Sequence, residues 1–386
     1  MFVGEKLTDI RVLHGYSRNE LAIALDVTEQ AVWQFENGYA TPGIETMSKI
    51  KQLFNVKNFF FYNDSSIGET VKEEGIAYRS SEKNNAKRTK TEAVYLRFIN
   101  YMMEYIEDFV EYPDNLILKL RDYTINQIIE EGQVTESLIK EIAIETRNIL
   151  GLNNQDNKNL LFLLEKNGLF IVERDLSVKT DAYSSWLNNN RPIIVLSNFK
   201  KSSVRRNFDL AHELGHLLLH YKINILELTT TEYEKIEREA NLFAANFLLP
   251  EELFLNDMKS VKRKSNPNSY IELKEKWHVS IAALAYRAYQ LNLLSYQQYR
   301  YFNGLLNKHG YRVQEPLDDT IPIIRPGKLR NSLRYIFENN LSDLNDFQKH
   351  TSFEIKLISK LFGIEEEFFS KYSVQPKIYN FKKRVK

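Results

Sequence analysis

The residues whose types and spacing point most directly to chemistry are His212, Glu213 and His216, in the segment FDLAHELGHLLLH. On a helix, the two histidines lie one turn apart and project from the same face. Two imidazoles so placed can bind one Zn²⁺, and Glu213 beside them can take a proton from water at the metal. The chain has only seven histidines in 386 residues, and three of them fall between positions 212 and 220. This clustering favours a metal site over two unrelated histidines.

A catalytic zinc site needs a third protein ligand and an open fourth position. His220 cannot share a metal with His212, because eight residues of helix rise about 12 Å and zinc–ligand bonds are about 2 Å long. A second helix is expected in the segment IEREANLFAANFLLP, with Glu237 inside its apolar stripe and Glu239 at the opposite edge. A carboxylate on a buried face needs a partner, which favours Glu237 over Glu239 as the ligand. Asn241, one turn after Glu237, can hydrogen-bond to a metal ligand or a histidine and so orient it without binding the metal itself.

Together the two segments resemble the ImmA/IrrE family of zinc metallopeptidases, and the similarity extends over about residues 136–313. The resemblance implies a small gluzincin-like protease domain that binds Zn²⁺. Some members of that family cleave a helix-turn-helix repressor and thereby derepress a mobile element or a stress response. The spacing of the residues alone implies only a hydrolytic metal site.

The composition excludes several classes of protein. The chain has no cysteine, which excludes disulfides and thiolate zinc sites and fits a reducing compartment. Its net charge of +1 gives no global attraction to nucleic acid, so DNA contacts must come from a local patch. No run reaches about 18 apolar residues, and the N-terminus lacks an apolar signal core. We therefore expect a soluble, cytoplasmic protein with no membrane partner.

Residues 1–62 carry a helical pattern of their own. Gly15 ends the first helix, Ser17 and Glu20 form a capping box at the start of the second, and Thr28 caps the third. The pattern predicts an N-terminal five-helix domain. Its second and third helices, joined by a tight turn, form a helix-turn-helix.

The string YSRNELAIALDVTEQAVWQFENGYATPGIETMSKIKQLFNV resembles the XRE/lambda-repressor-like DNA-binding family. The resemblance implies a recognition helix at about residues 28–35 that enters the major groove of double-stranded DNA. Such domains usually read an operator as dimers, because one recognition helix contacts few bases. The resemblance assigns phosphate contacts to Arg18 and Asn37 and groove contacts to Glu29, Gln30, Trp33 and Gln34.

Two acidic residues depart from what a DNA-binding surface would favour. Glu36 matches a structural glutamate of the family and is expected to support folding. Glu29 either accepts a hydrogen bond from a cytosine amine or weakens binding. A small helical bundle for dimerisation or protein docking is therefore the alternative interpretation of this segment.

The whole chain is predicted to be mainly α-helical with a small β-sheet, an α+β fold. The predicted parts are the helix-turn-helix domain at 1–62, a linker at 63–92, the peptidase domain at 93–313 and a helical C-terminal region of unknown role at 314–386. Strands at 168–172, 182–186 and 192–196 suggest a small antiparallel sheet beside the active helix. Residues 193–197 form either an edge strand that binds an extended peptide or an internal core strand.

These features predict a DNA-associated zinc-dependent endopeptidase that acts in transcriptional regulation. Its expected substrate is a protein, such as a repressor or a toxin or antitoxin partner. The alternative is a helix-turn-helix regulator or antitoxin whose peptidase-like domain senses or docks a partner without proteolysis. A purely structural zinc site is a third possibility, and it would require a fourth protein ligand.

Overall fold

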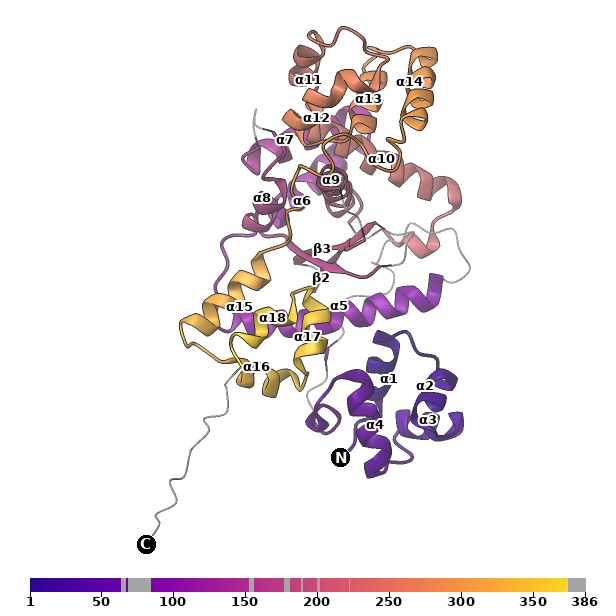
Figure 1. Cartoon of the computed structure of the whole chain (residues 1–386), viewed down its shortest axis with the longest axis vertical. Helices are drawn as coiled ribbons and strands as arrows, with labels where there is room; N and C mark the ends of the chain where they lie inside the picture. Colours follow the sequence, from indigo (N-terminus) through magenta and orange to yellow (C-terminus); the bar gives the residue numbers. More distant parts are fainter. Residues whose placement is uncertain are drawn as a thin grey trace, which may run out of the picture. The chain divides into compact units, whose positions relative to one another are not determined.

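The computed structural model shows two compact units connected by helices (Figure 1). Unit 1 contains residues 1–66, 101–110 and 331–386, and unit 2 contains residues 67–100 and 111–330. The division falls within two helices, α5 (Asn85–Glu107) and α15 (Lys328–Glu338). The structure describes residues 1–63, 67–68, 85–152, 156–176, 181–188, 190–199, 202–221 and 223–373.

Unit 1 begins with the predicted helical domain. Its helical segments are α1 (Gly4–Leu13), α2 (Arg18–Leu25), α3 (Glu29–Glu36), α4 (Ile44–Phe54) and the short 3-10 helix η1 (Asn58–Phe61). The fifth predicted helix is thus a single 3-10 segment. Ser17 and Glu20 form the expected capping box, and the Thr28 hydroxyl accepts a hydrogen bond from the Ala31 amide. These caps satisfy amide groups that a helix leaves unpaired at its start.

Glu36 stabilises this domain from inside. Its side chain is almost fully buried and receives hydrogen bonds from Arg11 and Arg18, each at 2.5 Å. A buried carboxylate requires such pairing, because an unpaired buried charge is costly. The structure therefore gives Glu36 a folding role.

The C-terminal helices of unit 1 are linked to the helix-turn-helix domain by backbone hydrogen bonds. They are α16 (Leu344–Thr351), α17 (Ile355–Phe362) and α18 (Glu366–Ser370). Lys57 donates its backbone N–H to the Ser352 carbonyl at 2.8 Å, and Glu354 donates to the Asn55 carbonyl at 2.9 Å. Phe353, between them, lies against the Phe60 ring with centroids 5.7 Å apart. The C-terminal helices thus complete the unit that contains the first 62 residues.

Unit 2 is built on a mixed three-stranded sheet in its described residues. The strands are β1 (Phe170–Arg174), β2 (Ala182–Leu187) and β3 (Arg191–Ser197), in the order β1-β3-β2. β3 pairs with β1 in parallel and with β2 in antiparallel orientation, so the prediction of an antiparallel sheet is only partly right. Because β3 is the central strand, it cannot accept an added peptide strand, and the interpretation of residues 193–197 as an edge strand is wrong. Among the described residues, β1 and β2 lie at the two edges of the sheet.

The two faces of this sheet are covered by different helices. α9 (Ser203–Leu219) packs on one face, where Ser184 and Trp186 of β2 hydrogen-bond with it. Alternate residues of a strand point to opposite faces. Accordingly, Tyr183 of β2 and Arg174 of β1 point to the other face and pair with Glu92 of α5, at 2.6 Å and 2.7 Å. The register of β2 therefore decides which of its side chains meet α9.

The predicted second helix is α10 (Thr230–Leu248), which lies beside α9 (Figure 1). The two helices come close at Gly215. A Cβ atom at that position would stand 3.1 Å from the Phe243 ring and 3.3 Å from the Ala240 Cα. The absence of a side chain at Gly215 therefore sets the separation of α9 and α10.

Replacing Gly215 with alanine is expected to lower the free energy of unfolding of unit 2 by about 1 kcal/mol or more, because the new methyl group must displace α10 or Phe243. The matched control is Gly304→Ala, on an exposed turn of α14 (Tyr296–Lys308) where a Cβ meets no atom within 4 Å. There alanine is expected to stabilise by about 0.5–1 kcal/mol. Urea unfolding of both variants measures the difference, and equal shifts would contradict the close packing.

Unit 2 contains further helices. They are α6 (Leu116–Glu131), α7 (Glu136–Ile149), α8 (Leu160–Lys166), η3 (Ile225–Glu227), α11 (Glu251–Met258), η4 (Pro267–Tyr270), α12 (Ile271–Trp277) and α13 (Ile281–Gln290). None of the helices in the described residues combines the length and apolarity required to cross a membrane. Most of the predicted linker, at 64–66 and 69–84, lies outside the described residues.

Candidate metal centre

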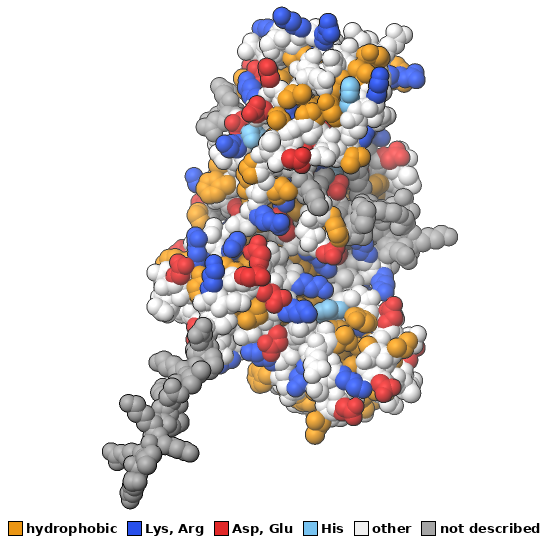
Figure 2. All heavy atoms as spheres, viewed as in Figure 1, with side chains coloured by type: hydrophobic (Ala, Val, Ile, Leu, Met, Phe, Trp, Pro, Cys, Tyr) orange, Lys and Arg blue, Asp and Glu red, His pale blue; other side chains and the backbone are white. Residues whose placement is uncertain are grey.

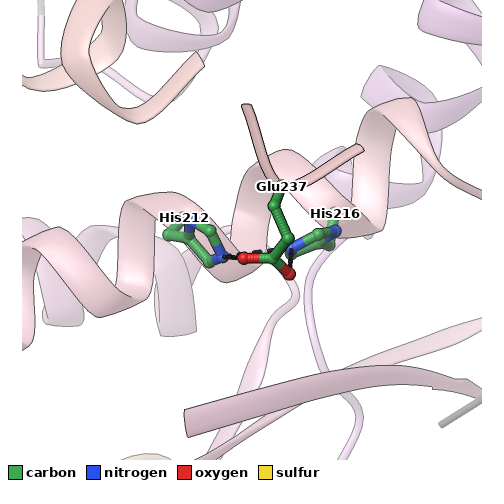
Figure 3. A group of neighbouring side chains, drawn as sticks. All are labelled: His212, His216 and Glu237. Atoms are coloured by element: carbon green, nitrogen blue, oxygen red, sulfur yellow. Dashed lines mark hydrogen bonds and ion pairs between the residues drawn. The ribbon is translucent and has the colours of Figure 1, made fainter. Parts of the chain in front are cut away.

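The two histidines of α9 and one glutamate of α10 converge on a single point (Figure 3). The Nε2 atoms of His212 and His216 are 3.0 Å apart. The Glu237 carboxylate lies against both rings, with one oxygen 3.4 Å from His216 Nε2 and the other 3.6 Å from His212 Nε2. One ligand atom from each of the three residues lies within 4.8 Å of the others.

These separations fit a metal ion. A tetrahedral Zn²⁺ with bonds of about 2.0–2.1 Å holds its ligand atoms about 3.3–3.4 Å apart, close to the three distances observed. Both imidazoles present Nε2 to the same point, so both can direct a lone pair at one cation. Among the described residues this group has three members, which is the ligand number of a zinc site that keeps one position open.

The far ring nitrogens of the two histidines are also engaged. His212 Nδ1 lies 3.1 Å from the Asn241 amide oxygen. His216 Nδ1 lies 2.9 Å from Nδ1 of His220, the residue that caps the C-terminus of α9. Histidine ligands of metals usually donate their second N–H in this way, which fixes the ring and its tautomer.

Glu239, the other ligand considered from the sequence, points away from the three-residue group. Its carboxylate lies 3.1 Å from His220 Nε2. Burial lowers the pKa of His220 to about 4, so its ring is neutral at neutral pH. Glu237 and Glu239 thus meet different histidines, because two residues of helix turn through about 200°.

Glu213 lies beside the two histidines in α9 and is buried. Ser184 of β2 donates its hydroxyl to the Glu213 carboxylate at 2.7 Å. Burial raises the pKa of Glu213 to about 7, while the neighbouring His216 and the Ser184 hydrogen bond act in the opposite direction. A carboxylate with a pKa near neutrality suits a proton acceptor.

Sequence reasoning missed Ser184 and the role of His220. The segment DAYSSW places two serines side by side, and only the strand register shows which one faces α9. His220 was excluded as a ligand of the metal, but its spacing of four residues from His216 was a signal that the two rings could meet.

The residues predicted to contact DNA lie on or next to α2 and α3. Glu29, Gln30 and Trp33 are exposed on α3, and Gln34 is partly exposed. The Trp33 ring stacks on Tyr39, with centroids 5.3 Å apart. Arg18, which starts α2, pairs with Glu36 but keeps 41% of its side chain exposed.

Asn37 follows the end of α3, and its side-chain amide donates to the Trp33 carbonyl at 2.8 Å. It thereby caps the C-terminus of the predicted recognition helix. On the face visible in Figure 2, basic and acidic side chains are interspersed. Residues 1–63 contain six Lys and Arg against seven Asp and Glu. The helix-turn-helix domain is therefore not a strongly basic surface.

Comparison with known proteins identifies two segments of the chain. Residues 164–289 match the family described as the IrrE N-terminal-like domain, and residues 7–57 match the helix-turn-helix family. An uncharacterized immunity region protein 2 of Bacillus phage phi105 is 40% identical over 65 residues, which are 16% of this chain and 40% of that protein. The chain therefore joins an XRE-type helix-turn-helix domain to an IrrE-like domain of a peptidase family.

Proposed function

We propose that the protein is a DNA-associated, zinc-dependent endopeptidase that acts in transcriptional regulation. The observation that carries this proposal is the convergence of His212, His216 and Glu237 beside the buried Glu213. A helix-turn-helix domain in the same chain supports action at DNA. Such action would place the protein in the cytoplasm.

The chemistry follows from the groups around the site. When bound, Zn²⁺ supplies Lewis acidity, which polarises a peptide carbonyl and makes water more acidic. Glu213 accepts the proton of the attacking water and delivers it to the leaving amine. Ser184 holds the carboxylate in place through its hydroxyl.

An extended segment of a protein is the substrate that this arrangement fits. β2 is an edge strand, and its Ser184 contacts Glu213 directly. Extended peptides commonly bind by adding a strand to such an edge, with main-chain hydrogen bonds supplying affinity. We propose a repressor or a toxin or antitoxin partner as the cleaved protein. The likeness to a phage immunity region protein supports this regulatory setting.

The test is a substrate trap. Tagged Glu213→Gln protein, with zinc bound, is used to capture proteins from the cells that express this chain. Each captured protein is then incubated with the unsubstituted enzyme, with and without a zinc chelator. Cleavage that requires both zinc and Glu213 supports the proposal. Regulation that persists unchanged in cells that carry only Glu213→Gln would instead favour a regulator that docks partners without proteolysis.

Ser184→Ala is expected to lower the rate of substrate cleavage about 10–100-fold, because a hydrogen bond to a charged group contributes about 1.5–3 kcal/mol. Ser185→Ala is the matched control, since Ser185 is equally buried but its side chain points to the opposite face of β2. Turnover and thermal unfolding are measured for both. If Ser185→Ala slows cleavage as much as Ser184→Ala, the contact with Glu213 is not the cause.

DNA binding by α3 leads to a separate prediction. Gln30→Ala is expected to weaken the preference for one base pair by about 1–3 kcal/mol, because glutamine can form two hydrogen bonds with the major-groove edge of adenine. Selection from randomised duplexes, repeated for the variant, measures that preference. Gln52→Ala, an exposed change on α4, is the control and should leave the selected sequence unaltered.

The salt dependence of that binding tests the same surface. With seven acidic against six basic residues in positions 1–63, few phosphates can be neutralised by one copy of the domain. We therefore expect a shallow fall of affinity with salt for each subunit and a homodimer on the operator.

A further inference from the structure

The Nδ1 atoms of His212 and His216 face away from the proposed metal position. Each makes a further contact, and the row of hydrogen bonds that follows differs between the two histidines. The Nδ1 atom of His212 contacts the amide oxygen of Asn241. The Nδ1 atom of His216 contacts Nδ1 of His220, and Nε2 of His220 in turn contacts the carboxylate of Glu239. The His220 side chain is 3% exposed and that of Glu239 is 12% exposed, so both contacts are shielded from water.

The direction of each hydrogen bond in this row follows from the metal site. If Nε2 of His216 directs its lone pair at a cation, the ring proton resides on Nδ1 and is donated to His220. His220 must then accept at its own Nδ1, so its proton resides on Nε2. That proton is donated to the Glu239 oxygen 3.1 Å away. Every donor in the row therefore meets an acceptor, and the row ends on a negative charge.

We propose that His220 and Glu239 are positioning residues for the metal centre. They fix the tautomer and the ring plane of His216, and the terminal carboxylate makes His216 a stronger ligand than His212. This inference rests on the metal binding that the proposed function requires.

The placement of Glu239 fits this role rather than metal binding. Its second oxygen lies 3.7 Å from the ammonium group of Lys235, one turn earlier on α10. The Lys235 side chain is 62% exposed, so its ammonium group stays solvated while it pairs with the Glu239 oxygen that does not contact His220. Hydrogen-bond partners of metal ligands typically change metal affinity by about 10–100-fold when they are removed.

The first measurement is the tautomer of each histidine. Protein with nitrogen-15-labelled histidine and bound zinc is examined by NMR, which distinguishes protonated from unprotonated ring nitrogens. We expect His216 to be protonated at Nδ1 and His220 at Nε2. A His220 protonated at Nδ1 would overturn the inference. A protein that binds no zinc at all would instead contradict the proposed function.

The second measurement compares zinc affinities by competition with a chromophoric chelator. Glu239→Ala is expected to weaken zinc binding by about 10–100-fold, and Glu239→Gln by less, because glutamine keeps a neutral acceptor for His220. Glu234→Ala, which removes an exposed glutamate from the same helix, is the matched control.

Glu239→Gln also serves as a control for loss of folding, because glutamine preserves the size and shape of the side chain at a largely buried position. If both Glu239 variants remain folded and bind zinc as tightly as the Glu234 control, the row of hydrogen bonds does not position the ligand. If the affinity order is unsubstituted protein, then glutamine, then alanine, the inference is supported.

Discussion

Glutamine in place of Glu213 is expected to reduce substrate cleavage by about 10²–10⁴-fold, the usual contribution of a general acid–base group. Glutamine has nearly the same size and can still accept the Ser184 hydrogen bond, but it cannot take a proton from water. Zinc content should remain near one ion per chain, because Glu213 is not among the three converging ligands. Single-turnover cleavage and metal analysis on the same sample measure both quantities.

Glu234→Gln provides the control for this prediction. Glu234 is an exposed glutamate of α10 that pairs with Arg238, and its loss should leave cleavage unchanged. A Glu213→Gln protein that cleaves at the unsubstituted rate would show that another group accepts the proton. One that has lost its zinc would show that Glu213 is part of the metal site.

The second large effect concerns Glu237. Its replacement by alanine removes one of the three proposed ligands and is expected to weaken zinc binding about a thousandfold. This corresponds to about 4 kcal/mol, roughly a third of the about 10–16 kcal/mol that structural zinc sites provide. Competition with a chelator measures the affinity, and the spectrum of the Co²⁺-substituted protein reports the number of ligands.

The informative comparison is with Glu239→Gln, two residues further along α10. We expect that change to have a much smaller effect, about tenfold, because Glu239 contacts His220 and not the cation site. If Glu239→Gln abolished zinc binding while Glu237→Ala did not, the assignment of the third ligand would be reversed.

Much of the site is predictable because helical geometry is local. The spacing of His212 and His216 fixes their common face, and the apolar stripe of α10 already separates Glu237 from Glu239 in the sequence pattern. The same reasoning identifies the capping residues Ser17 and Thr28, since a cap involves residues only three positions apart.

Features that depend on distant partners were not predictable in this way. The continuous apolar run of β3 fits a central strand, but it does not identify the two strands with which β3 pairs. α6 was not anticipated, because its buried stripe contains the polar Arg121 and Thr124 as well as Ile117 and Leu120. The contact of Ser184 with Glu213 likewise depends on the register of β2 against β3.

The pairing of residues 55–57 with residues 352–354 has a consequence for how the protein can be divided. Unit 1 is assembled from three separate stretches of chain, and both stretches of unit 2 are inserted between them. During translation, residues 352–354 are synthesised long after the N-terminal helices. Those helices therefore cannot form these contacts until most of the chain has been made. Truncation after residue 330 would therefore remove those C-terminal neighbours from the helix-turn-helix domain.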